Sequence, residues 1–75
     1  MVRMLDFAFS TSDEITAELG LRLKAVRLSQ SLTQADLAER AGISVGTVKS
    51  LERTGQSSVA SLVRVVQALG LTDQL

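Results

Sequence analysis

The sequence has 75 residues, of which 45% are hydrophobic and 21% are charged, and its formal net charge is zero. A chain of this length accommodates one domain with one modest core, and this composition is typical of a globular domain rather than a disordered segment. The chain contains no cysteine and no histidine, which excludes disulfides, thiolate or imidazole metal sites and the usual general base at neutral pH. We therefore expect neither a cofactor nor an enzyme.

No apolar run approaches the roughly 18 residues that a membrane-spanning helix needs, and the first residues lack the layout of a signal peptide. The sequence therefore predicts no membrane association and a cytoplasmic location. The charges are unevenly distributed. Residues 1–20 hold one cation against four acids, whereas residues 21–75 hold seven cations against four acids. Only the second, basic part suits a partner of negative charge.

Residues 1–11 alternate weakly between polar and apolar side chains and include both aromatic residues, Phe7 and Phe9. This pattern is compatible with an N-terminal arm, a short strand or a flexible start, and an arm could pair with a second protomer. The sequence leaves these alternatives open.

The first helix is expected to begin at Thr11, because Thr11 and Glu14 have the spacing of a capping box. Beyond this point, apolar residues at helical spacing predict one buried face, formed by Ile15, Leu19, Leu23 and Val26. Gly20 costs such a helix about 1 kcal/mol relative to alanine, so it predicts a kink or a later start. The adjacent acids Asp13 and Glu14 are explained by the helix dipole rather than by acid–base catalysis.

Two short helices are expected on either side of Gly42, a residue that suits the left-handed end of a helix. Thr33 and Asp36 form a second capping signal, after which the apolar face consists of Leu37, Ala38 and Ala41. Ile43 is predicted to be a buried plug between the helices. Ser44 is predicted to cap the next helix, which ends at about residue 53.

A fourth helix is expected after a loop at residues 54–57, with Ser57 or Ser58 as its cap and Gly70 at its end. Its predicted inward face consists of Val59, Leu62, Val65, Val66 and Leu69. Residues 71–75 have the composition of the start of a further element, so we expect the natural chain to be longer.

Two short helices joined by a turn of three or four residues around Gly42 meet the geometric requirement of a helix-turn-helix. The sequence also resembles the phage-repressor and Cro-like helix-turn-helix family, called the xenobiotic-response-element family, over residues 19–71. The resemblance depends on residues spaced through the chain: Leu23, Arg27, Gln34, Leu37, Ala38, Gly42, Ser44, Val48, Glu52, Leu62, Val65, Ala68, Leu69 and Gly70. It implies an all-α, lambda-repressor-like DNA-binding domain of four to five helices over residues 12–75, preceded by the arm at 1–11.

The resemblance also implies roles for individual residues. Gln34 corresponds to a glutamine that holds a DNA phosphate and steadies the recognition helix, and Thr33 adds a hydroxyl contact. Ser44 is primarily a helix cap, with any DNA contact additional. The side chains expected to face bases and flanking phosphates are Val45, Gly46, Thr47, Lys49, Ser50 and Arg53. Gly46 departs from the larger residue usual at its position.

Arg27 and Glu52 occupy positions that in this family form a salt bridge between the first helix and the recognition helix. We interpret both residues as structural rather than DNA-binding. Removing one partner of such a pair, if it is partly buried, is expected to cost several kcal/mol.

The sequence thus predicts a transcriptional regulator, most simply a repressor, that binds a pseudo-palindromic operator in double-stranded DNA as a homodimer. The first alternative is an antitoxin similar to the HipB-like kind, which represses its own operon and binds a toxin protein. The second alternative is a protein-interaction module that has lost DNA binding, for which the zero net charge and Gly46 are the supporting features.

Overall fold

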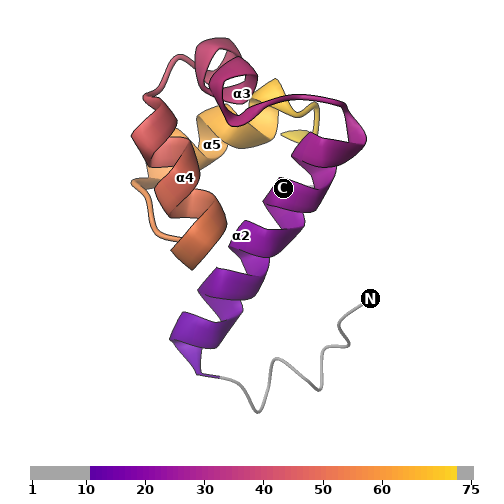
Figure 1. Ribbon diagram of the computed structural model, residues 1–75. Coiled ribbons are helices and arrows are strands. Elements are labelled where there is room, and N and C mark those ends of the chain that lie inside the picture. Colours follow the sequence, from indigo (N-terminus) through magenta and orange to yellow (C-terminus); the bar gives the residue numbers. More distant parts are fainter. Residues whose placement is uncertain (1–10, 73–75) are drawn as a thin grey trace.

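The computed structural model describes residues 11–72, which form four helices and no strand. In the labels of Figure 1 these are α2 (Ser12–Ser29), α3 (Gln34–Ala41), α4 (Val45–Thr54) and α5 (Val59–Ala68). This result confirms the predicted all-α fold with a helix-turn-helix. The predicted arm at 1–11, including Phe7 and Phe9, lies outside the described residues except for Thr11.

Each helix begins where a hydroxyl side chain accepts a hydrogen bond from the backbone of its first turn. The four caps are Thr11, Thr33, Ser44 and Ser58. Such a cap satisfies one of the N–H groups that a helix start leaves without a partner. Only Thr33 has the full capping box, in which its hydroxyl accepts from the Asp36 N–H while the Asp36 carboxylate accepts from the Thr33 N–H.

The turn between α3 and α4 consists of three residues, Gly42, Ile43 and Ser44. Gly42 has the left-handed φ of 68° that the sequence predicted, and the Ile43 N–H donates to the carbonyl of Ala38. Ile43 is only partly buried, packed against the edge of the core rather than plugged within it.

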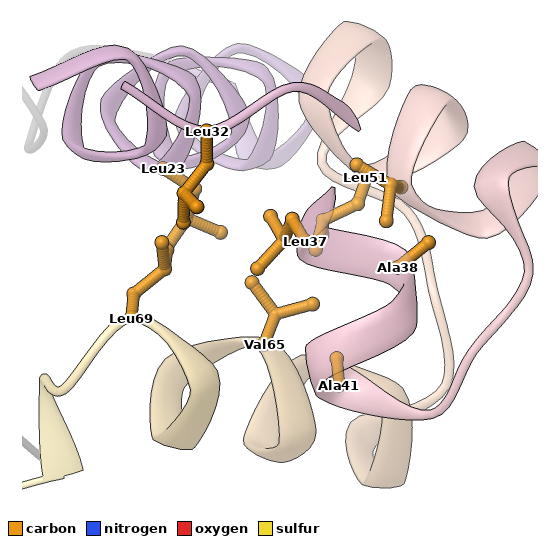
Figure 2. Packing of buried hydrophobic residues seen from close by; sticks show 9 residues of the cluster. Leu23, Leu32, Leu37, Ala38, Ala41, Leu51, Val65 and Leu69 are labelled. Carbon is orange, nitrogen blue, oxygen red and sulfur yellow. The ribbon is translucent and has the colours of Figure 1, made fainter. Parts of the chain in front are cut away.

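The core is one aliphatic cluster to which all four helices contribute (Figure 2). Its most deeply buried side chains are Leu37, Val48, Leu51 and Val65, from α3, α4 and α5. Leu23 from α2 and Leu32 from the α2–α3 connection cover one side of the cluster, next to Leu69 (Figure 2). The cluster therefore fixes α4 against the rest of the domain by its inner face.

Two predicted core positions are wrong. Leu19 is 40% exposed, because the side of α2 that faces α4 is formed by Gly20, Leu23 and Arg27 instead. Val59 is 77% exposed, because it lies at the start of α5, where residues 56–60 are all exposed and burial begins only at Ser61. The remaining predicted inward positions of α5 are buried or half-buried.

Gly20 neither kinks nor delays α2, which runs without interruption from Ser12 to Ser29. A Cβ atom at position 20 would overlap the carbonyl oxygen of Leu51 and lie 3.1 Å from the Gly55 nitrogen. Gly55, with φ of 77°, in turn leaves no room for a Cβ against the Thr16 backbone. The backbones of α2 and α4 are therefore in direct contact, side by side in Figure 1, and only glycine fits at this crossing.

Candidate nucleic-acid interface

Helix α4 has one buried side and one exposed side. Val48, Leu51 and Glu52 are buried, whereas Gly46, Lys49 and Arg53 are exposed. The exposed three recur at intervals of three and four residues, the spacing that places side chains on one face of a helix. This outer face of α4, defined by positions 46, 49 and 53, is available to a partner without disturbing the core.

The other α4 residues predicted to contact DNA are partly engaged within the protein. Val45 is half-buried and packs against the core cluster. The hydroxyls of Ser44 and Thr47 lie 2.8 Å apart, and Ser44 also accepts from the Thr47 N–H at 3.1 Å. The Ser50 hydroxyl donates to the Gln56 carbonyl over 3.4 Å. These four side chains therefore border the outer face of α4 and also shape its first turn and the loop that follows it.

Arg27 and Glu52 form the ion pair that the resemblance implied. The Arg27 Nε and Nη2 atoms donate to the two Glu52 oxygens at 2.6 and 3.0 Å, and Nη1 donates to the Leu32 carbonyl at 2.7 Å. Arg27 is 5% exposed and Glu52 is 4% exposed. A bidentate pair at this depth fixes the angle between α2 and α4, because each charge is costly without its partner.

Gln34 at the first position of α3 donates from Nε2 to Glu52 Oε1 at 3.1 Å. The glutamine is thus tied to α4 through the same carboxylate that Arg27 holds. This hydrogen bond joins the start of α3 to α4, and the DNA-binding role that the resemblance implies for Gln34 stays a prediction.

Thr33, next to Gln34, is exposed at the start of α3. Its backbone N–H and its hydroxyl both lower the pKa of Asp36 below its ordinary value of 3.8, with a smaller contribution from the charge of Arg40. The Asp36 carboxylate is therefore ionised throughout the neutral range. It keeps Thr33 and the first turn of α3 in place.

A shallow hollow lies where α2, α3 and α4 meet. Its lining comprises Leu21, Lys24, Gln34, Lys49, Glu52 and Arg53. The structure thus brings together three of the predicted site residues, Gln34, Lys49 and Arg53, around one depression. Thr33 directly precedes Gln34 in the sequence. The other residues predicted to contact DNA lie at the cap and in the first two turns of α4.

Two lining residues, Lys24 and Leu21, are exposed on α2 and were not predicted from the sequence. A signal for Lys24 was present, because it precedes Arg27 by three residues and so lies on a neighbouring row of the same helix. Once Arg27 is paired with Glu52, that row must lie close to α4. Leu21 gave no comparable signal.

Nothing in the described range offers a metal site, since no three acidic side chains cluster there. None of the helices at residues 11–72 is long and apolar enough to cross a membrane.

Residues 23–74 match a protein-family model described as Helix-turn-helix. The match begins within α2 and includes all of α3, α4 and α5. No curated protein matches the sequence closely enough to count as a relative.

Proposed function

Because this chain belongs to the Cro-like helix-turn-helix family of DNA-binding domains, we propose that it is a sequence-specific regulator of transcription. In this proposal α4 enters the major groove and α3 lies across the phosphate backbone. The observation that supports it best is the division of α4 into a buried side and an outer face of exposed residues. A recognition helix needs this division in order to contact bases while it remains fixed to its domain.

Within the proposal, the residues fall into two groups. Gln34 and Thr33 hold phosphates, which position the domain on the duplex. Lys49 contacts a guanine edge or a phosphate, and Arg53 contacts the backbone. The residues that border these contacts are Ser44, Val45, Gly46, Thr47 and Ser50.

We further propose that the protein acts as a repressor that binds a pseudo-palindromic operator as a homodimer. A single helix of 10 residues offers few base contacts, and two recognition helices reach successive major grooves when they are about 34 Å apart. Two exposed valines on α5, Val59 and Val63, support a contact with a second copy because they lie one turn apart on the same side. Such a regulator works in the compartment that holds its DNA, which we take to be the cytoplasm.

The test is selection of binding sites from a random duplex library, followed by titration of the enriched sequence by fluorescence anisotropy. We expect a motif with two-fold symmetry and affinity that falls steeply with salt. Lys49→Ala should cost about 1 to 3 kcal/mol and relax one position of the motif if it contacts a base. Gln34→Ala should weaken binding to all sequences alike.

Arg40→Ala is the matched control, since Arg40 is an exposed cation of α3 beside Asp36 and Glu39, apart from the outer face of α4. This variant should bind as the unmodified protein does. A folded, helical sample that enriches no sequence would contradict the proposal and leave the interaction module as the better explanation.

An antitoxin that also binds a toxin protein is the second candidate. The observation that favours it is the pair of exposed leucines on α2, Leu21 and Leu28, which are 55% and 56% exposed and lie two turns apart. Exposed apolar side chains on one face of a helix are typical of protein contacts. Addition of the product of a neighbouring gene to the DNA complex, followed by sedimentation analysis, distinguishes this candidate from a regulator without a partner.

A further inference from the structure

We propose that Lys24 makes α2 a third DNA-binding element, in which its ammonium group holds a phosphate beside the groove that α4 enters. This inference rests on the proposed function and extends it to a helix outside the helix-turn-helix. The ligand proposed for Lys24 is the DNA backbone rather than a base.

The placement of Lys24 is the first argument. Lys24 is exposed and lines the same hollow as Gln34, Lys49 and Arg53, so that three helices present donors to one depression. The backbone contact at Gly20, one turn before Lys24, fixes this part of α2 against α4. The position of Lys24 relative to the outer face of α4 is therefore set by the fold, and only its flexible side chain remains to be ordered when DNA binds.

The charge of the hollow is the second argument. Three cations line it, Lys24, Lys49 and Arg53, against one acid, Glu52. Glu52 is buried and already paired with Arg27 and Gln34, so its charge is neutralised from within the protein. The remaining three charges around the hollow are all positive, and a phosphate placed among them lowers their mutual repulsion.

The third argument is that Lys24, Lys49 and Arg53 have no ion-pair partner among the described residues. Within residues 11–72, Lys24, Lys49 and Arg53 have no acidic side chain within ion-pair distance. By contrast, Arg22, two residues before Lys24, faces Glu18 at 3.6 Å. Arg40 lines a different hollow, together with Asp36 and Glu39. Arg40 and Arg64 also have no ion pair within residues 11–72, and Arg64 Nη1 donates to the Gly42 carbonyl at 3.5 Å. Lys24, Lys49 and Arg53 differ from these two because they line one hollow, on the side that the proposed function assigns to DNA.

The experiment compares Lys24→Gln with Arg40→Gln, a matched loss of one exposed cation elsewhere. Binding to the selected duplex is titrated across a range of salt concentrations by fluorescence anisotropy. The plot of log K against log salt has a negative slope, and loss of one phosphate contact makes that slope less steep by about 0.9. Lys24→Gln should therefore bind about eightfold more weakly near 0.1 M salt, and the difference should vanish near about 1 M.

Lys24→Arg should restore the slope because it keeps the charge, and all variants should retain the helical circular dichroism of the unmodified protein. The proposal is overturned if Lys24→Gln keeps the full salt slope, or if it changes the preferred base at any position. Failure of the unmodified protein to bind any duplex would overturn the proposed function as well, and so differs from failure of this inference alone.

Discussion

Arg27 and Glu52 combine the deepest burial of charge in the described residues with the most complete hydrogen bonding. Both are almost fully removed from solvent, and three contacts hold the guanidinium group while Gln34 adds a fourth to the pair. The desolvation of two such charges is offset only while both are present. The pair therefore specifies the position of α4 more than it adds to the stability of the fold.

We expect Arg27→Met to destabilise the domain by about 3 to 5 kcal/mol, because Glu52 would remain charged and buried without its partner. The double variant Arg27→Met with Glu52→Leu should lose less than the single one, since it leaves no buried charge. Urea unfolding followed by circular dichroism measures both. A double variant that is less stable than Arg27→Met would contradict this expectation, because Glu52 would then contribute to stability even without Arg27.

At the scale of helices, the crossing of α2 and α4 determines where the outer face of α4 points. Gly20 and Gly55 allow the two backbones to touch, and the Arg27–Glu52 pair lies two turns further along α2. The crossing thus has one steric and one electrostatic constraint. Two constraints at different points along α2 fix the crossing angle between α2 and α4 as well as the distance between them.

Gly20→Ala and Gly46→Ala form a matched pair that tests this crossing. Alanine in a helix interior is ordinarily about 1 kcal/mol more favourable than glycine. At position 46 the nearest atom to a new Cβ would be the Ser44 hydroxyl oxygen at 3.8 Å, so we expect stabilisation of up to about 1 kcal/mol. At position 20 the new Cβ would overlap the Leu51 carbonyl oxygen, so we expect destabilisation.

Thermal unfolding measures both variants. If Gly20→Ala proved as stable as the unmodified protein, α2 and α4 would be able to move apart at little cost in free energy. The backbone contact at Gly20 would then not constrain the crossing.

The sequence predicted the ends of these helices better than their packing. Hydroxyl caps and Gly42 act locally, so Thr11, Thr33 and Ser44 were identifiable from their neighbours alone. The role of Gly20 depends on α4, which is about thirty positions away in the chain. The low helix propensity of glycine therefore predicted a kink or a later start, and neither occurs. Leu19 was assigned to the core for the same reason, since apolar spacing cannot reveal that a glycine occupies the contact line.

The candidate site was predictable to the extent that it follows a known motif. Gln34, Lys49 and Arg53 were named from the resemblance, and the structure brings them to one hollow. Lys24 lies outside the motif and required the packing of α2 to be found. The further engagement of Ser44, Thr47 and Ser50 in local hydrogen bonds also depends on side-chain geometry that spacing does not specify.

Residues 11–72 share a single core, and each of the four helices described contributes to it. A domain of this size has only a few kcal/mol of net stability, and no described part has a separate cluster of its own. Loss of one central side chain should therefore weaken all four helices together, in a single cooperative transition.

Val48→Ala tests this expectation, because Val48 is completely buried at the centre of the cluster. We expect a loss of about 2 kcal/mol with the transition still cooperative. Val63→Ala, at a position that is 36% exposed, should lose less than half as much. Circular dichroism in urea gives both values, and two separate transitions for Val48→Ala would contradict the single core.

The open space around Gly46 bears on how a protein of this kind changes its target over evolutionary time. In the proposed role, position 46 faces the operator, yet a Cβ atom there would meet nothing closer than the Ser44 hydroxyl oxygen at 3.8 Å. Most substitutions reduce stability, and a protein close to its stability threshold tolerates few of them. A larger residue at position 46 would avoid this restriction, since position 46 is exposed and outside the core. A single codon change would therefore give selection a new binding preference in a domain whose fold is unaltered.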